Sequence, residues 1–337
     1  MQTTDITPDD RIGVLVANLG TPDSPSPRDV RRYLKQFLWD PRVVEVPRPI
    51  WWLVLNLVIL NTRPRRSAKA YAKIWTDDGS PLLVISEQQQ TALQAVLEHK
   101  YDGQVRSALA MCYGSPSIPA GLAELQAAGC RRILVLPLYP QYSATSNAAV
   151  FDAVYTEMRN WRAVPELRVV NDYFDDDAYI RALADSVRRY QSQHGVPDRL
   201  LMSFHGIPQE YADAGDPYPC QCEVTAMLLA KELGLAASQW QFSFQSRLGP
   251  KAWLKPYTDE TLAALPGEGV KNIQVICPGF SVDCLETLEE IAMENRDVFL
   301  EAGGEQYSYI PCLNAESAHI EMLAGLVGRH LQGWFDE

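Results

Sequence analysis

One histidine in this sequence stands where ligands are usually met. His205 comes directly after the apolar run 200–204 and directly before Gly206. In open α/β sheets, ligands collect beyond the carboxyl ends of the strands, so an imidazole at this point is placed to act on one. A lone histidine is often structural, however, so this position by itself leaves both interpretations open.

Three carboxylates recur at helical spacing further along the chain. In a helix that begins near Asp283, Glu286 and Glu290 follow at positions i+3 and i+7, so the three would share one face. Glu289 would point elsewhere. A structural interpretation covers Asp283 and Glu286, which have the spacing of a capping box in an acidic first turn. It does not cover Glu290, because Glu286 and Glu290 repel each other unless a cation or a proton intervenes.

The elements that carry these residues follow an α/β alternation. Short apolar runs with strand character are separated by amphipathic stretches. The expected strands are 12–17, 133–137, 199–204 and 273–277, and the expected helices are 29–38, 87–99, 148–158, 222–233, 285–296 and 317–331. Such alternation predicts parallel sheets covered by helices.

Two sequence patterns occur twice in the same order. VLVANLGTP at 14–22 is repeated as LLMSFHGIP at 200–208, and GCRRILVLPLYPQYS at 129–143 is repeated as GVKNIQVICPGFS at 269–281. Each repeat runs from a strand into a turn. This order indicates duplicated halves.

We therefore expect two similar domains, residues 1–170 and 171–337, each built on a parallel sheet. The stretch 317–331 would form a closing helix, against a domain that the sequence does not specify. We place His205 and Glu286 at corresponding strand ends of the two halves, so that a cleft between the domains brings them face to face.

An imidazole and a carboxylate with open coordination positions suit a labile ion such as Fe²⁺ better than a permanent structural metal, which takes four ligands. The metal is then expected to be a substrate. Aromatic side chains at the same strand ends could wall a flat apolar ligand or belong to the core. These are Tyr113, Tyr139, Tyr142, Trp253 and Phe280.

The first half is longer than the second by about 45 residues, comparing Pro22 to Pro137 with Pro208 to Pro278, and this places an insertion at about 30–80. The insertion holds an apolar run, 50–60, which is far shorter than the roughly 20 residues needed to cross a bilayer. A basic stretch follows at 63–69. This pattern is typical of a segment seated on an anionic membrane surface, and a buried core helix is the alternative.

Composition excludes several classes of function. Lys and Arg number 30 against 42 Asp and Glu, which gives a net charge of -12 and a pI near 5.0 and argues against binding a nucleic-acid backbone. No glycine-rich dinucleotide or P-loop motif occurs, and no Gly-x-Ser-x-Gly. Residues 1–10 lack the features of a signal peptide, so we expect a cytoplasmic protein. The seven cysteines are scattered, with only Cys220 and Cys222 close together, so neither a disulfide framework nor a zinc or iron–sulfur site is expected.

Taken together, these patterns resemble the ferrochelatase family over nearly the whole chain. In the second half the motifs are 201–208 (LMSFHGIP), 215–219 (GDPYP), 244–250 (FQSRLGP) with Trp253, and 277–290 (CPGFSVDCLETLEE). In the first half they are 16–22 (VANLGTP), Tyr71 with 79–81 (GSP), 111–116 (MCYGSP) and 138–143 (LYPQYS).

The resemblance implies insertion of Fe²⁺ into protoporphyrin IX to give protohaem, the last step of haem synthesis, in a cleft between two Rossmann-like domains of the chelatase fold. His205 would accept pyrrole protons or bind the arriving iron, with Glu286 as its partner across the cleft. Asp283 and Glu290 would continue a carboxylate path. The insertion would form an apolar lip for the porphyrin. The implied contacts to the macrocycle are Leu19, Tyr71, Ser80, Tyr113, Tyr142, Trp253 and Phe280.

The resemblance has two departures. Cys112 stands where related chains often have arginine, which puts a propionate contact there in doubt. The sequence ends at Glu337 without the cysteine-bearing extension that carries an iron–sulfur cluster in some members, so no resident cofactor is expected.

Two other functions stay open. A chelatase for coproporphyrin would perform the same chemistry on a more carboxylated ring, against which the apolar lip argues. A two-domain protein could also carry haem or iron without turnover, although a carboxylate face leading to a histidine suits proton traffic better. We expect peripheral contact with the inner face of the membrane through Ile50, Trp51, Trp52 and Leu53.

Overall fold

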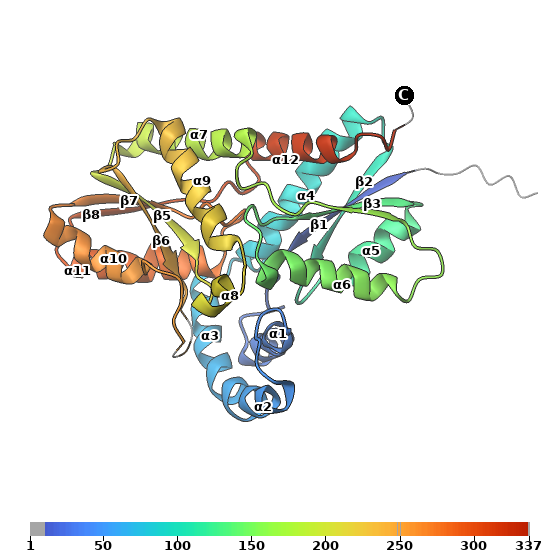
Figure 1. Ribbon diagram of the computed structural model, residues 1–337, viewed down its shortest axis with the longest axis horizontal. Coiled ribbons are helices and arrows are strands. Elements are labelled where there is room, and N and C mark those ends of the chain that lie inside the picture. The colour runs from blue at the N-terminus through green and yellow to red at the C-terminus, as the bar shows by residue number, and fades with distance from the viewer. Residues whose placement is uncertain (1–10, 248, 250, 336–337) are drawn as a thin grey trace, which may run out of the picture.

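The computed structural model describes residues 11–247, 249 and 251–335 and contains two parallel four-stranded sheets (Figure 1). The first has the order β2-β1-β3-β4 and the second β6-β5-β7-β8. The strands are β1 (Ile12–Asn18), β2 (Val105–Met111), β3 (Arg132–Pro137), β4 (Glu166–Val169), β5 (Arg199–His205), β6 (Trp240–Gln245), β7 (Asn272–Ile276) and β8 (Gln306–Ile310). The α/β fold class and the equivalence of the two halves are confirmed, because the strands take the same order in both sheets.

Helices cover the sheets, and each predicted helix is present with shifted ends. The α-helices outside the insertion are α4 (Pro81–Lys100), α5 (Ile118–Ala127), α6 (Ala149–Met158), α7 (Asp177–His194), α8 (Gln209–Asp213), α9 (Tyr218–Leu233), α10 (Thr258–Ala264), α11 (Asn295–Glu301) and α12 (Ser317–His330). The remaining segments are the π-helices η2 (Ala144–Ala148) and η4 (Glu286–Glu294) and the 3₁₀ helix η3 (Leu265–Glu268). The stretch predicted as one helix at 285–296 is thus a π-helix that continues into α11.

The closing helix α12 joins the two halves. It packs against α4 of the first half and α7 of the second, and the three helices share one apolar core (Figure 1). Beyond α12, the Trp334 indole donates to Glu166 on β4 at 2.6 Å, and Arg168 donates to the His330 carbonyl at 2.6 Å. The C-terminal segment therefore returns to the edge of the first sheet. The domain boundary near residue 170 stays a prediction, and α7 packs on the second half, as that boundary requires.

A buried polar cluster crosses the same interface. The Gln89 amide on α4 donates to the Asn314 carbonyl at 2.9 Å and to the Ser281 carbonyl at 3.1 Å. His319 on α12 lies beside it, with Nδ1 at 2.7 Å from the Asn314 carbonyl, so Nδ1 carries the proton that it donates. Burial lowers the pKa of His319 to about 4, and the ring is neutral in the folded protein.

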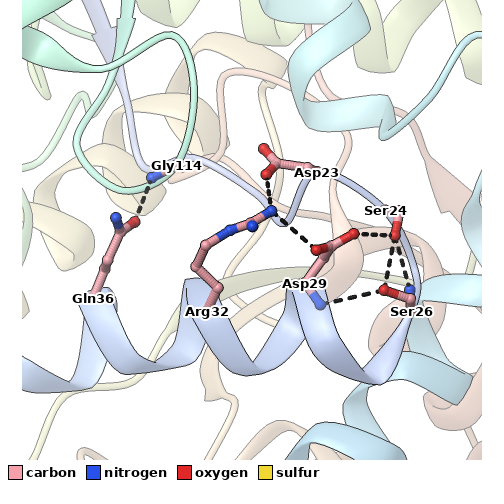
Figure 2. A network of polar contacts seen from close by, with 7 residues as sticks. All are labelled: Asp23, Ser24, Ser26, Asp29, Arg32, Gln36 and Gly114. Atoms are coloured by element: carbon pink, nitrogen blue, oxygen red, sulfur yellow. Dashed lines mark hydrogen bonds and ion pairs between the residues drawn. The ribbon is translucent and has the colours of Figure 1, made fainter.

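The predicted insertion is a helical unit of its own between β1 and α4. It contains α1 (Pro27–Trp39), α2 (Arg48–Leu53), the π-helix η1 (Val54–Ile59) and α3 (Leu60–Ile74), which lie together on one side of the two sheets (Figure 1). Polar contacts fix the start of α1 (Figure 2): Ser26 caps the Asp29 amide at 3.2 Å, and Arg32 pairs with Asp23 and Asp29. Gln36 accepts from the Gly114 amide and so ties α1 to the loop after β2.

The apolar run of the insertion is neither wholly buried nor wholly exposed. Ile50, Trp52, Leu53, Leu57 and Val58 are each more than half exposed. No described helix is long and apolar enough to span a membrane.

The expectation that Trp51 faces outward was wrong. Its side chain is buried, and its indole donates to the Leu38 carbonyl of α1 at 2.6 Å. Trp51 therefore anchors α2 to α1, while its neighbours form the exposed face.

His319 predicts how stability depends on pH. Its pKa is about 4 in the folded protein and near 6.5 in the unfolded chain, so the unfolded chain binds the extra proton as the pH falls through this window. The stabilisation is complete above pH 6.5 and is lost towards pH 4. We measure the free energy of unfolding in urea at pH 7 and at pH 4.5. The decrease between these pH values should be about 2 kcal/mol smaller for His319→Gln than for the unsubstituted protein. The exposed His99→Gln is the control, and equal losses in all three proteins would contradict the assignment.

Candidate functional site

The candidate site lies at the carboxyl ends of neighbouring strands in the second sheet. His205 is the last residue of β5, in register with Gln245 at the end of β6. The π-helix η4 follows β7, the other neighbour of β5. The prediction that His205 and Glu286 come from opposite halves was therefore wrong. Both belong to the second half, and the first half faces them with its insertion.

The strand ends approach closely because residue 206 is glycine. A Cβ atom at Gly206 would lie 2.9 Å from the Gln245 carbonyl oxygen, closer than real Cβ contacts allow. The Gly206 amide instead donates to that oxygen at 2.8 Å. This contact holds His205 next to the end of β6.

His205 has one nitrogen committed and one available. Its Nδ1 lies 2.6 Å from the Gly206 carbonyl, which can only accept, so Nδ1 carries the proton in this contact. In the tautomer with this proton on Nδ1, Nε2 carries none and can take a proton or bind a metal ion. The half-buried imidazole lies beside Phe280, with the ring centroids 6.3 Å apart.

Glu286 opens η4 and faces the insertion. Its Oε2 accepts from the Cys284 thiol at 3.1 Å, and its carbonyl accepts from the Gln245 amide at 3.0 Å. Burial raises the pKa of Tyr33 and of Tyr71 well above the usual value, and the Glu286 charge raises both further. The carboxylate therefore lies within electrostatic reach of two buried, neutral phenols from α1 and α3.

Glu290 lies one turn further along η4 and accepts two hydrogen bonds from Ser246. The Ser246 amide donates to Oε1 at 2.7 Å, and the Ser246 hydroxyl donates to Oε2. Burial raises the pKa of Glu290, the Ser246 hydroxyl and His205 lower it, and Glu286 raises it. The structure thus brings His205, Glu286 and Glu290 into one electrostatically linked group.

The spacing predicted that Asp283 shares a helical face with Glu286 and Glu290, and this was wrong. The helix begins after Asp283. Its buried carboxylate accepts from the Tyr309 hydroxyl at 2.6 Å, the Asn314 amide at 2.7 Å and the Thr287 hydroxyl at 3.1 Å. The predicted capping box is replaced by Thr287, whose hydroxyl accepts from the Cys284 amide.

Glu289, which the spacing set apart from the other carboxylates, makes a contact of its own. Its carboxylate pairs with Lys73 on α3 at 2.5 Å. This ion pair links η4 to the insertion.

The residues expected to contact a macrocycle fall into four places. Leu19, Tyr71 and Tyr113 lie in the apolar cluster of the insertion, which also takes in Leu285 and Leu288 next to Glu286.

Two others lie beside His205. Phe280 packs against its ring, and Trp253 lies against Gly206, where a Cβ would be 3.3 Å from the indole. The hydroxyls of Ser80 and Thr21 are 2.7 Å apart and buried.

Tyr142 lies at the rim of a cavity of about 230 Å³ between the insertion and the second half, which Glu45, Tyr211 and Asp216 also line. A larger cavity of about 530 Å³ lies beside β6 and α10 and is lined by none of the predicted site residues. Of the residues that line the smaller cavity, Tyr142 alone was predicted as a site residue.

Sequence reasoning missed Gln245, Ser246, Tyr33 and Cys284. Gln245 ends β6 and Ser246 follows it, and this strand was not predicted, so no strand end marked them. Tyr33 lies on a predicted helix, but nothing in its spacing indicates that it faces Glu286.

Comparison with known proteins decides the family. The sequence model of the ferrochelatase family matches residues 11–331. The ferrochelatase of Thioalkalivibrio sulfidiphilus is 57% identical over 96% of this chain and 88% of its own. Ferrochelatase 1 of Shewanella oneidensis is 53% identical over 97% and 98%. The chain belongs to the ferrochelatase family.

This membership confirms the resemblance inferred from the motifs. Ferrochelatases are lyases that insert iron into a porphyrin in haem biosynthesis, so the predicted enzyme class and function are confirmed as well.

Solved structures support the fold. SirB from Bacillus subtilis with Fe³⁺ matches with a TM-score of 0.56 and 11% identity, covering 95% of both chains. The sirohydrochlorin chelatase SirB from Bacillus subtilis subspecies spizizenii with cobalt matches with a TM-score of 0.54 and 10% identity, covering 95% of this chain and 94% of its own. At such identities the likeness shows the chelatase fold alone.

The contacts of Asp283 predict a stability defect. In Asp283→Asn, an amide NH₂ replaces one of the carboxylate oxygens that accept from Tyr309, Thr287 and Asn314, so buried donors lose their partner. We expect a loss of about 2 to 3 kcal/mol in unfolding free energy, measured in urea. Glu290→Gln is the matched control and should lose less, because burial already favours the uncharged form there. An Asp283→Asn protein of normal stability without activity would instead favour the catalytic role implied by the resemblance.

Proposed function

We propose that the protein inserts Fe²⁺ into protoporphyrin IX beside η4 and the insertion, with His205, Glu286 and Glu290 as the catalytic group. The observation that carries this assignment is the juxtaposition of an imidazole with a free Nε2 and two half-buried carboxylates, opposite a wall of neutral aromatic side chains. Such a group accepts protons and offers nitrogen and oxygen to a metal ion in the same space.

Metallation releases two pyrrole protons, and the site has acceptors for both. A neutral imidazole is a suitable general base near neutral pH, and His205 keeps Nε2 open for this role. Glu290 has a pKa raised by burial, so its proton affinity is closer to that of an imidazole. We propose that protons pass from His205 to the carboxylates of η4.

The iron is a substrate in this proposal, met by His205 and Glu286. Among the described residues, no three His, Cys, Asp or Glu side chains form a set that could hold a metal ion. A site with only two protein ligands suits a metal ion that must be transferred to the porphyrin. We further propose that no iron–sulfur cluster or other resident cofactor takes part in the reaction.

The uncharged wall favours protoporphyrin over coproporphyrin. Burial raises the pKa of Tyr33 and Tyr71 well above the usual value and that of the half-buried Cys112 thiol to about 12, so all three are neutral at physiological pH. A neutral apolar wall suits vinyl groups better than additional carboxylates, which would be desolvated without a partner.

Substitution of His205 tests the catalytic assignment. We expect His205→Ala to lose at least 100-fold in anaerobic Fe²⁺ insertion into protoporphyrin IX, because the general base is gone. Loss of free-base porphyrin fluorescence over many equivalents is the measurement, with coproporphyrin III in parallel. The control is His99→Ala on the exposed end of α4, and circular dichroism checks the fold. A fully active His205→Ala would remove His205 from the mechanism, and quenching of the unsubstituted protein that stops after one equivalent would favour a haem or iron carrier.

We also propose that the exposed face of α2 and η1 rests on the inner face of the membrane. Ile50, Trp52, Leu53, Leu57 and Val58 form this apolar face. Exposed basic side chains of α3, Arg65, Arg66 and Lys69, follow it in the chain. An apolar face with a basic flank is what a peripheral segment presents to anionic lipid.

Vesicle binding tests this contact. We expect the double variant Trp52→Ser, Leu57→Ser to bind phosphatidylglycerol vesicles at least tenfold more weakly in co-sedimentation, because two apolar side chains no longer enter the bilayer. The matched control is Val196→Ser with Met227→Ser, which removes exposed apolar side chains elsewhere. Equal binding by both double variants would contradict the proposal.

A further inference from the structure

Ser246 has a backbone conformation that its residue type does not favour. Its φ is 69°, in the left-handed region. The other described non-glycine residues with positive φ are Asp102 and Asn314, whose side chains tolerate this region better. Serine gains no such local benefit, so the conformation must be held by contacts made elsewhere.

The contacts that it makes are directed at one carboxylate. With positive φ, the amide and the hydroxyl of Ser246 both point at Glu290, one to each oxygen. Glycine would relieve the strain and keep the amide contact but would lose the hydroxyl. The serine side chain is therefore the reason for a strained residue at this position.

The preceding residue ties the same strand end to the rest of the site. Gln245 donates from its side chain to the Glu286 carbonyl at 3.0 Å and accepts at its own carbonyl from Gly206, next to His205. Its side-chain oxygen accepts from the buried Ser203 hydroxyl at 2.7 Å, which fixes the amide orientation. The end of β6 thus contacts both elements that carry the catalytic group.

We propose that Ser246 is a positioning residue, which fixes the Glu290 carboxylate in one orientation on the side of His205 for the proton transfers of metallation. The proposal rests on the proposed function. Ser246 itself contacts neither the porphyrin nor the iron in this role. It acts through Glu290, so its removal slows turnover without weakening porphyrin binding.

Two variants separate positioning from stability, because they change the hydroxyl and the backbone strain in opposite ways. Ser246→Gly removes the hydroxyl and relieves the strain, whereas Ser246→Thr keeps the hydroxyl and adds the strain of a β-branched residue at positive φ. We expect Ser246→Gly to lose about tenfold or more in kcat, with unchanged KM for the porphyrin and an unchanged or higher Tm. Ser246→Thr should have a lower Tm and a kcat closer to that of the unsubstituted protein.

Two controls complete the experiment. Asp102→Gly relieves a positive φ in the exposed turn after α4 and should leave kcat unchanged. In a Glu290→Gln background, measured by single-turnover rates, Ser246→Gly should slow the reaction no further, because its partner is already altered.

Activity that follows Tm across the variants would overturn the proposal, as would an equal loss from Ser246→Gly in both backgrounds. Absence of turnover by the unsubstituted protein would contradict the proposed function itself, whereas an active protein with an unaffected Ser246→Gly variant contradicts only the role of Ser246.

Discussion

The site depends on the close approach of two strand ends, which glycine alone permits. At Gly206 a Cβ would meet the Gln245 carbonyl at 2.9 Å, and at the equivalent point of the first half a Cβ on Gly20 would lie 1.7 Å from the Tyr113 carbonyl. Each glycine lets the turn after an inner strand lie against the end of the neighbouring edge strand. In the second half this contact places His205 beside the residues that hold η4. In the first half it places Leu19 beside Tyr113, in the apolar cluster of the insertion.

The two halves share this geometry and divide the chemistry. The second half supplies all three members of the catalytic group, His205, Glu286 and Glu290. The first half supplies neutral phenols and apolar side chains from its insertion, and burial keeps those phenols protonated. For Glu290, burial favours the acid form and raises the pKa, whereas the Ser246 hydroxyl and His205 favour the ionised form and lower it. Such opposed influences keep a proton exchangeable.

The sequence predicted the inner strands and missed the edges. Strands β1, β3, β5 and β7 have neighbours on both sides in their sheets, and each was found from its apolar run. Strands β2, β4, β6 and β8 lie at the sheet edges, where polar residues are tolerated, as in WQFSFQ of β6 and QYSYI of β8. Their mixed composition hides them from an argument based on apolar runs. His205 could therefore be placed, because its strand is an inner one. Gln245 ends an edge strand and Ser246 follows it, so neither could be placed.

The carboxylates show where helical spacing is too simple a rule. The i, i+3, i+7 argument assumes an α-helix from Asp283, but the regular helix starts later and as a π-helix with i to i+5 hydrogen bonds. Glu286 and Glu290 stay near each other under either geometry, since both spacings are close to one turn. Asp283, ahead of the helix, is free to turn into the second half and bind Tyr309 and Asn314. The repulsion between Glu286 and Glu290 was thus the informative signal, because a like-charge pair must be held in place by other groups. Here Ser246 donates to Glu290 and Cys284 donates to Glu286.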